Sequence, residues 1–305
     1  MAPHVCVVIL NFNGLEWLEK CCSSVLETDY DNLHTILVDN ASTDGSVEFV
    51  RNRFPQIEVI SSVTNAGFSE GNNAGIRRSL ERNADYVVLL NPDTRVEPAW
   101  LRGLIGVGES EDRVGILGAV QLEYQSDALN SWTTTAFPGF LDELRSPDTA
   151  RPLIEVDWVE GACIAIKRNV FEEIGLLDTI YFAFYEEIDF CRRAQRRGWM
   201  VALVPQSRIH HRRGGMWEAN PELKRRRDYT CDRSQFIYMI TSPDRSLAGN
   251  LKGYAITFAT KAKEAMKGTS NGRIWDLVRM QFEVLGNAGA LREKWKRDSA
   301  LSPMK

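Results

Sequence analysis

Short apolar runs alternate with amphipathic stretches along the first hundred residues. Residues 5–10 form a continuous run rich in β-branched side chains, as in strands buried on both faces of a parallel sheet. Further strands are predicted at residues 35–38, 58–61 and 86–90, with helices at residues 15–27, 45–53 and 72–82. This alternation predicts an α/β fold with a doubly wound, mostly parallel sheet that binds ligands at the carboxyl ends of its strands.

The pattern loosens after Trp100. Residues 125–148 are rich in Ser, Thr, Pro and Gly, which predicts a long functional loop. Strands are then predicted at residues 162–167 and 200–204, helices at residues 169–174 and 192–197, and an aromatic and acidic stretch at residues 181–190. Beyond residue 215 the pattern becomes helical, with an apolar stripe at Leu247, Leu251, Tyr254 and Phe258.

Composition and charge add a division along the chain. The 305 residues are 44% hydrophobic and 26% charged, which suits one large soluble domain with a smaller appendage. Residues 1–204 carry 17 Lys and Arg against 31 Asp and Glu, whereas residues 205–305 carry 20 against 10. The basic C-terminal third is therefore expected to meet something anionic. Its basic clusters lack interleaved aromatic residues and the body is acidic, which disfavours nucleic acid.

The six cysteines favour a reducing compartment. They show no paired metal-ligand spacing and sit mostly among apolar residues. The N-terminus enters a strand almost directly, without a basic and apolar leader. Because no apolar stretch reaches the roughly 18–20 residues of a spanning helix, we expect a cytoplasmic protein that does not cross a membrane.

A carboxylate follows the strand at residues 86–90, in the tripeptide Asn91-Pro92-Asp93. Hard divalent cations prefer oxygen ligands, so Asp93 at a strand end is well placed to hold such a cation against a diphosphate. Asn-Pro-Asp is also an ordinary turn sequence. The other strand ends decide which interpretation is stronger.

The first strand ends in Asn11-Phe12-Asn13-Gly14, which has neither the glycine pattern of a dehydrogenase clamp nor that of a P-loop. An aromatic flanked by amides can stack on a nucleotide base and bond its edge, although a capping turn would look similar.

The second strand runs into Asp39, with Asn40 and Ser42 behind it, and its carboxylate can accept from a base imide or a ribose hydroxyl. We expect Asp44, further on, to cap the next helix. Residues 65–75 combine glycines with amides at a helix start, which suits phosphate binding or a well-capped helix.

These segments together resemble family 2 glycosyltransferases of the GT-A fold, and especially rhamnosyltransferase-like members, over residues 4–215. The matching segments, in the family's order, are Val8-Ile9-Leu10-Asn11-Phe12-Asn13-Gly14, Val38-Asp39-Asn40-Ala41-Ser42-Thr43-Asp44-Gly45-Ser46, Asn65-x-Gly67-Phe68-x-x-Gly71-Asn72-Asn73-x-Gly75-Ile76 and Leu90-Asn91-Pro92-Asp93. The resemblance implies a GT-A catalytic domain over residues 1–215, with a nucleotide-sugar-binding half (1–100) and an acceptor and catalytic half (101–215). Residues 216–305 would form a helical, basic extension.

The resemblance also implies roles on the donor side. Phe12 and Asp39 would hold the pyrimidine and its ribose, and Asn91 and Asp93 stand where the family has its Asp-x-Asp metal motif. Asn91 replaces the first acid, so Mg²⁺ or Mn²⁺ would rest on Asp93, with His211 completing the metal shell or contacting the diphosphate. The expected nucleotide-sugar-binding residues are Asn11, Phe12, Asn13, Asp39, Asn40, Ser42, Asn65, Gly67, Asn72, Asn73, Asn91 and Arg212.

The second half would supply the reaction. Trp158 and Gly161 look like the family's acceptor-side wall, where an aromatic stacks on a sugar, although a buried tryptophan beside a glycine bend is a rival interpretation. Glu187 lies where the family places the general base, with Glu186 and Asp189 beside it. Mutual repulsion and burial among aromatics would raise one pKa toward neutrality, while Asp189 would cap or orient the following helix.

The sequence therefore predicts an inverting, metal-assisted glycosyltransferase that moves a sugar, such as rhamnose, from a UDP- or dTDP-sugar to a glycan or lipid-linked glycan in cell-surface polysaccharide synthesis. The basic extension suits the inner face of a membrane, the catalytic domain or a second subunit in a homo-oligomer. Two alternatives stay open: a catalytically silent nucleotide-sugar-binding or scaffold protein, and a nucleotidyltransferase, which normally needs a glycine-rich basic first loop.

Overall fold

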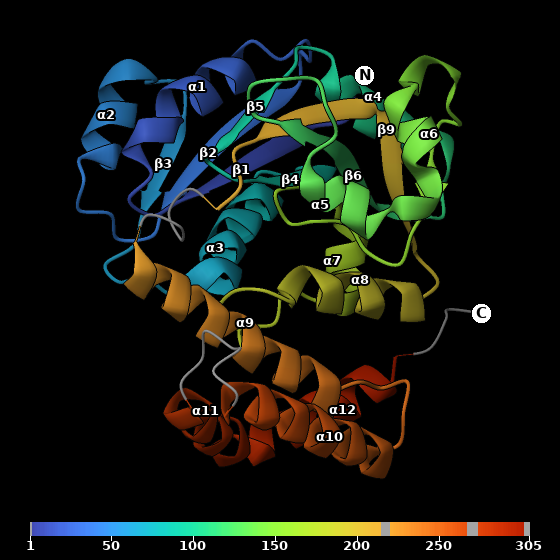
Figure 1. The fold of residues 1–305 in the computed structure, drawn as a ribbon. Helices are drawn as coiled ribbons and strands as arrows, with labels where there is room; N and C mark the ends of the chain where they lie inside the picture. Colours follow the sequence, from blue (N-terminus) through green and yellow to red (C-terminus); the bar gives the residue numbers. More distant parts are fainter. Residues whose placement is uncertain (1, 215–219, 267–273, 302–305) are drawn as a thin grey trace.

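A computed structural model describes residues 2–214, 220–266 and 274–301. Figure 1 shows a twisted central sheet between helices, with a separate group of helices below it. The strands are β1 Val5–Asn11, β2 Leu33–Asp39, β3 Glu58–Ser61, β4 Tyr86–Leu90, β5 Thr94–Val96, β6 Val114–Glu123, β7 Ile154–Glu155, β8 Cys163–Lys167 and β9 Met200–His211. The helices are α1 Leu15–Leu26, α2 Ser46–Arg53, α3 Gly67–Glu81, α4 Trp100–Ser110, α5 Ser131–Ala136, α6 Leu141–Arg145, α7 Arg168–Ile174, α8 Glu186–Arg196, α9 Pro221–Ile240, α10 Leu247–Met266, α11 Ile274–Gly286 and α12 Ala288–Ser299.

The sheet has the order β3-β2-β1-β4-β8-β6-β9-β5, and β7 pairs with β9. Strands β1 to β4 are mutually parallel, and β6 runs parallel to β9. Strand β8 lies between β4 and β6 and runs antiparallel to both, while β5 and β7 run antiparallel to β9. Most strands therefore point the same way, which confirms the predicted mostly parallel α/β sheet.

Helices cover both faces of the sheet, as the continuous apolar strands require. Side chains of α1, α2 and α4 pack on one face, against alternate residues of β1 such as Val5 and Val7. Side chains of α3, α7 and α8 pack on the other face, against Cys6 and Val8. This doubly wound arrangement leaves the strand ends to carry the polar groups of the site.

Several predicted elements differ from the structure, four of them by more than two residues or in type. Helix α3 begins at Gly67, five residues before the predicted start, and α8 begins at Glu186 and so includes the acidic stretch. The predicted loop at residues 125–148 contains α5 and α6, which cover an apolar cluster on β6. Strand β9 continues past Val204 to His211. The proline at residue 205 does not end the strand, because it lies at a bulge in the pairing of β9 with β6.

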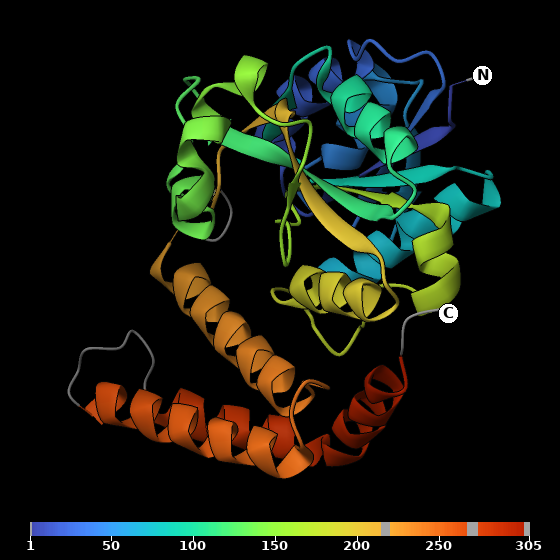
Figure 2. The ribbon, with the colours of Figure 1, turned by 90° about the vertical axis from the view of Figure 1, so that its right-hand side faces the viewer.

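The C-terminal region is helical, as predicted. Figure 2 shows α9 leading away from the sheet, α10 and α11 side by side below it, and α12 returning toward α8. Phe236, Leu277 and Leu291, from three of these helices, share an apolar cluster with Tyr181 of the sheet domain. The predicted boundary between residues 215 and 216 lies outside the described residues.

Two predictions concern the environment of the chain. All six cysteines are free thiols, and five of them are buried, as their apolar neighbours in the sequence indicate. Among the described helices, none combines the length and the apolar character that crossing a membrane would require.

Candidate active site

The ends of β1 and β2 lie side by side and share a polar network. Asn11 pairs with Asp39 in the register of the two strands, and its Nδ2 donates to Asp39 Oδ1 at 3.0 Å and to Ser42 Oγ at 3.1 Å. The backbone N–H of Ser42 donates to the other Asp39 oxygen at 2.9 Å, and that of Asn13 donates to Ser42 Oγ at 2.8 Å. Phe12 is partly exposed between the two amides. The network fixes the loop around the ring of Phe12.

A second network links this corner to the start of α3. Asn40 Nδ2 donates to Asn65 Oδ1 at 2.9 Å and to the Gly67 carbonyl at 3.0 Å, and Asn40 Oδ1 accepts from the Ala66 N–H. Asp44 forms hydrogen bonds at the start of the next helix, as expected, and of one other. Its carboxylate accepts from the N–H groups of Ser46, which begins α2, and Leu15, which begins α1. The predicted amides therefore hold each other and the loops, which shapes the edge of the sheet.

Gly67 joins this edge to the aromatic stretch before α8. Its φ of +85° is left-handed, and a Cβ added there would lie 2.4 Å from the Phe182 carbonyl oxygen. The Phe68 N–H donates to the same carbonyl at 2.6 Å. Only glycine allows this approach, so the start of α3 and the segment before α8 meet at Gly67.

Asn72 and Asn73 are inside α3 and bond to protein groups. Asn72 Nδ2 donates to the Phe68 carbonyl, and Asn73 exchanges two hydrogen bonds with the backbone of Leu177 at 2.9 and 3.1 Å. Both side chains are buried. In this arrangement the Asn73 amide links α3 to the segment that follows α7.

Asp93 and His211 form the acid and imidazole pair of the site. Asp93 Oδ1 lies 3.2 Å from His211 Nε2, and the His211 Nδ1 lies 2.8 Å from Gln121 Oε1. That oxygen also accepts from Asn130 Nδ2, so the Nδ1 of His211 carries the hydrogen and Nε2 faces Asp93. Burial lowers the pKa of His211, but the Asp93 carboxylate outweighs burial and leaves the pKa above its ordinary value.

Glu160 stands between this pair and Glu187, and sequence analysis assigned it no role. Burial raises the pKa of Glu160, against the neighbouring His211 and Arg213, which lower it. Its Oε2 is buried and has no hydrogen-bond partner among the described residues. The sequence signal for Glu160 was its position beside Trp158 and Gly161, the expected acceptor-side wall. No such signal pointed to Gln121, because the hydrophobic pattern predicted no strand around it.

Glu187 occupies the first turn of α8, and its pKa is raised. Burial is the main cause that raises its pKa to about 7, and the Glu160 charge adds to the rise while backbone N–H groups oppose it. Its Oε2 has no hydrogen-bond partner among the described residues, and its Cβ lies 3.8 Å from where a Cβ on Gly161 would be. Burial and the Glu187 charge raise the pKa of Glu186 well above its ordinary value.

Asp189, expected to cap or orient the following helix, pairs with two arginines of that helix. It lies inside α8 with no exposed surface, and it accepts from Arg192 Nη2 at 2.8 Å and Arg193 Nε at 3.0 Å. Burial opposes its ionisation, but Lys294, Arg193 and Arg192 together hold the pKa of Asp189 well below its ordinary value. Of the three neighbouring acids, Asp189 is therefore the one that stays charged in a cationic surrounding.

A family model described as Glycosyl transferase family 2 matches residues 6–175, more than half of the chain. The chain belongs to glycosyltransferase family 2. Membership makes it a nucleotide-sugar-dependent glycosyltransferase, which is consistent with strand ends rich in amides and acids.

Curated relatives carry related names. The low-salt glycan biosynthesis hexosyltransferase Agl10 of Haloferax volcanii is 32% identical over 202 residues, which are 64% of this chain and 63% of that protein. The N-acetylglucosaminyl-diphospho-decaprenol L-rhamnosyltransferase of Mycobacterium tuberculosis is 24% identical over 237 residues, covering 67% of this chain and 75% of the relative. The dTDP-rhamnosyl transferase RfbF of Shigella flexneri is 21% identical over 211 residues, covering 69% and 70%.

Two solved structures share the fold. The mannosyltransferase PcManGT of Pyrobaculum calidifontis, in complex with GDP-Man and Mn²⁺, superposes with a TM-score of 0.59 at 17% identity, over 99% of this chain and 85% of that one. GalNAc-T7 with UDP, GalNAc and Mn²⁺ superposes with a TM-score of 0.63 at 15% identity, over 93% and 55%. Both likenesses confirm the GT-A type of fold.

In this glycosyltransferase Trp158 and Gly161, the residues expected on the acceptor side, lie in an aromatic group that includes Trp132, which Arg213 contacts. Trp158 packs against Trp132 with ring centroids 5.4 Å apart, and Gly161 lies beside Phe68. The guanidinium of Arg213 lies 4.6 Å from the Trp132 ring and its Nε lies 3.8 Å from Glu160 Oε1. Arg212 bonds through its N–H to the Asp93 carbonyl, which keeps both arginines next to the acid and imidazole pair.

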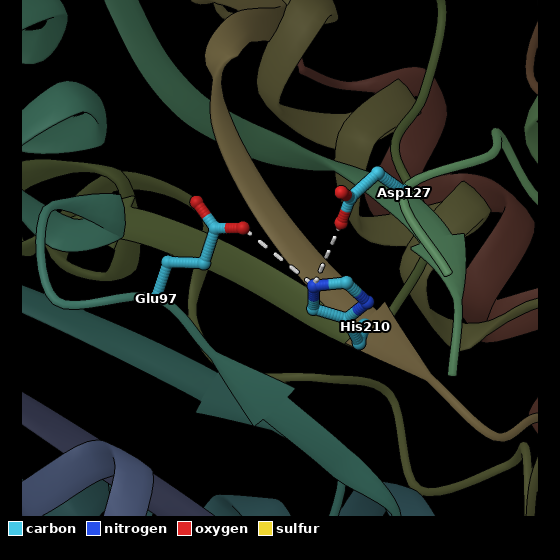
Figure 3. Close-up of side chains that lie close together, drawn as sticks. All are labelled: Glu97, Asp127 and His210. Atoms are coloured by element: carbon cyan, nitrogen blue, oxygen red, sulfur yellow. Dashed lines mark ion pairs between the residues drawn. The ribbon is translucent and has the colours of Figure 1, made fainter. Parts of the chain in front are cut away.

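A second group of possible metal ligands, at His210, contrasts with His211. Figure 3 shows Glu97 and Asp127 directed toward His210 Nε2, at 3.6 and 3.8 Å. The side chains of Glu97 and Asp127 are 48% and 88% exposed, so water competes for these carboxylates. Adjacent residues of a strand point to opposite faces, which separates this group from Asp93 and His211.

Proposed function

We propose that this chain is an inverting glycosyltransferase that uses a UDP- or dTDP-sugar, with dTDP-rhamnose as the first candidate, and Glu187 as general base. The single observation that carries the proposal is the half-buried Glu187 side chain, whose Oε2 is buried without a hydrogen-bond partner among the described residues and whose pKa is raised to about 7. A base with this pKa is half deprotonated near neutral pH, where general-base catalysis is most efficient.

The reaction would proceed in one displacement. The acceptor hydroxyl oxygen forms a bond to the anomeric carbon while the bond from that carbon to the diphosphate oxygen breaks. The hydroxyl proton passes to Glu187, and the diphosphate leaves with the electron pair of the broken bond. Attack opposite to the leaving group inverts the anomeric configuration.

The donor nucleotide would occupy the joined ends of β1 and β2. Phe12 offers a partly exposed ring for stacking, and the network around Asn11, Asp39 and Ser42 sets its position. Asn40, Asn65 and Gly67 would shape the sugar and phosphate side. The choice of rhamnose rests on the similarity to the two rhamnosyltransferases, and the choice of dTDP on the name of the dTDP-rhamnosyl transferase RfbF alone.

Asp93 and His211 would hold Mg²⁺ or Mn²⁺. Their donor atoms are 3.2 Å apart, a separation that fits one cation about 2.1 Å from each, and Nε2 is the ring nitrogen that faces Asp93. An imidazole ligand favours Mn²⁺ over Mg²⁺, which takes oxygen ligands. When bound, the cation supplies positive charge that stabilises the departing diphosphate. Arg212 and Arg213, next to this pair, would add charge on the same side.

The acceptor would be a glycan or a lipid-linked glycan of the cell surface, resting on Trp158 and Gly161. The described part of α10 and α11 supports a membrane-bound acceptor, because Ile256, Trp275, Phe282 and Leu285 are more than half exposed. Lysines and arginines accompany them on these helices. Such a face suits the surface of an anionic membrane.

A donor screen tests this proposal. Melting temperatures are measured with UDP-, dTDP- and GDP-sugars, with and without Mn²⁺, since a ligand at about 100 times its Kd stabilises by about 2.7 kcal/mol. The best donor is then incubated with glycan acceptors, and the anomeric configuration of the product is read by NMR. Retained configuration would contradict the inverting mechanism, and binding without transfer or hydrolysis would favour a silent sugar-nucleotide-binding protein.

A further inference from the structure

The turn that carries Glu186 and Glu187 begins in an unusual backbone conformation. Phe184 and Tyr185, the two residues before α8, have φ values of +67° and +70°. Residues other than glycine rarely adopt this left-handed conformation, and it persists where the surroundings hold it. The contacts around the start of α8 therefore decide where Glu187 lies.

Helix α9 of the C-terminal region holds the segment just before this turn. Ser234 Oγ donates to the Ala183 carbonyl at 2.8 Å, and Arg233 Nη1 donates to the Ile180 carbonyl at 3.2 Å. The rings of Tyr185 and Tyr238 lie 5.4 Å apart. These contacts fix the backbone on the N-terminal side of α8.

Helix α12 reaches α8 itself through Lys294. The Lys294 Nζ lies 2.8 Å from Asp189 Oδ1 and 2.9 Å from Oδ2. The same nitrogen lies 2.8 Å from Asp298 Oδ2 and 3.1 Å from Asp178 Oδ2. The side chain of Lys294 is 2% exposed and that of Asp189 is fully buried. One ammonium thus joins α12, α8 and the segment before α8.

Charges of both signs surround this ammonium and the proposed base. The charged and titratable groups near Lys294 are Asp178, Tyr181, Asp189, Arg192, Arg193, Arg297 and Asp298. Those facing Glu187 are Glu160, Tyr185, Glu186, Cys191 and Cys231. Glu187 therefore has acidic neighbours, and the cations lie on the Asp189 side of the helix.

Removing the Lys294 charge would take one of three cations from Asp189, which keeps Arg192 and Arg193, while Arg297 still pairs with Asp178 and Asp298. Asp189 lies two residues after Glu187 in the same helix, so a shift of Asp189 toward solvent moves the proposed base as well. A misplacement of about 1 Å in a reacting group can lower a rate about 100-fold. Both the position and the protonation of Glu187 would then change.

We propose that Lys294 is a positioning residue for the acidic turn of α8, through its contact with Asp189, so that the C-terminal helices complete the active site. The proposal rests on Glu187 as the base of the proposed function. Lys294 lies outside the residues 6–175 that match the family model, so this support comes from the chain's own C-terminal region.

The test compares Lys294→Met with Lys296→Met in the full chain. Lys296 is a half-exposed lysine of the same helix, paired with Glu293 at 2.9 Å. Melting temperatures establish that both variants are folded, and transfer is assayed well below them over a range of pH. If Lys294→Met does not fold, Lys294→Gln, which keeps a hydrogen-bond donor, is measured in the same way.

We expect Lys294→Met to lower kcat by about 10- to 100-fold while the donor KM stays within about twofold, since the donor residues lie on other elements. A Glu187 drawn toward solvent would lose part of the burial that raises its pKa, so the acidic limb of the pH profile should also move to lower pH. Lys296→Met should match the wild type in both respects.

Two results separate the possible failures. A folded Lys294→Met with wild-type kcat and an unmoved limb, beside an inactive Glu187→Gln, would overturn this proposal alone. A lower melting temperature without either kinetic change would likewise reduce Lys294 to a stabilising residue. Near-normal turnover of Glu187→Gln would instead refute the base assignment and this proposal with it.

Discussion

Asp93 Oδ1 and His211 Nε2 lie 3.2 Å apart, on the loop after β4 and at the end of β9. The carboxylate holds the pKa of His211 above its ordinary value, so Asp93→Asn should lower that pKa in an NMR titration. Because a protonated imidazole cannot bind a metal, Mn²⁺ affinity should rise with pH in the wild type. Asp93→Asn should weaken Mn²⁺ binding by about 10-fold or more in calorimetry.

Asp127→Asn is the control for the metal assignment. Asp127 belongs to the exposed group around His210, so its loss should leave Mn²⁺ affinity unchanged. The reverse pattern would place the cation at His210.

Glu187→Gln should lower turnover by about 10²- to 10⁴-fold, because an amide cannot accept the acceptor proton. Donor affinity should persist, since the proposed nucleotide contacts come from β1 and β2. Nucleotide release and donor titration measure the two quantities. Glu172→Gln, at a 57% exposed side chain on α7, is the matched control and should be fully active. Equal activity of the two variants would leave Glu187 without a catalytic role.

The pH profile of transfer should show an acidic limb near 7. The raised pKa means that Glu187 is protonated, and therefore inactive as a base, below that pH. Glu160→Gln removes one negative charge that raises the pKa of Glu187, so its limb should move to lower pH. An unmoved limb would mean that the limb reports another group.

Gly67→Ala should destabilise the fold by about 2 kcal/mol or more, because the left-handed backbone and the Phe182 carbonyl both reject a Cβ. Gly106→Ala is the comparison within α4, where an added Cβ meets nothing within 4 Å. A helical alanine there should stabilise by about 0.5–1 kcal/mol. Urea unfolding midpoints measure both, and a neutral Gly67→Ala would show that α3 can shift away from Phe182.

A Trp275→Ser and Phe282→Ser double variant should bind anionic vesicles less than the wild type does, because each side chain is 75% exposed on α11. Flotation with vesicles of phosphatidylglycerol and phosphatidylcholine measures the difference. Val63→Ser, at a 96% exposed side chain of the sheet domain, should bind as the wild type does. If the double variant instead dissociates a dimer in sedimentation, this face contacts a second copy.

The sequence predicted the polar strand ends but not the packing that joins them. The β-branched run of β1 and the motif at Asp39 depend on neighbours in sequence, so the parallel half and its candidate residues could be read directly. The role of Asn73 depends on Leu177, and the environment of Asp189 depends on Lys294. The sequence placed Arg192 and Arg193 near Asp189, but contacts between residues as far apart as Asp189 and Lys294 leave no local pattern.

Strand β8 runs against its neighbours, so its beginning lies beside the end of β4, where the Asn91 N–H donates to the Ala162 carbonyl at 3.0 Å. Residues 124–153, the segment between β6 and β7, end before this junction. A change in the length of that segment would therefore leave the junction intact. One backbone hydrogen bond, from Asn91 to Ala162, ties the strand end before Asp93 to the strand start after Glu160.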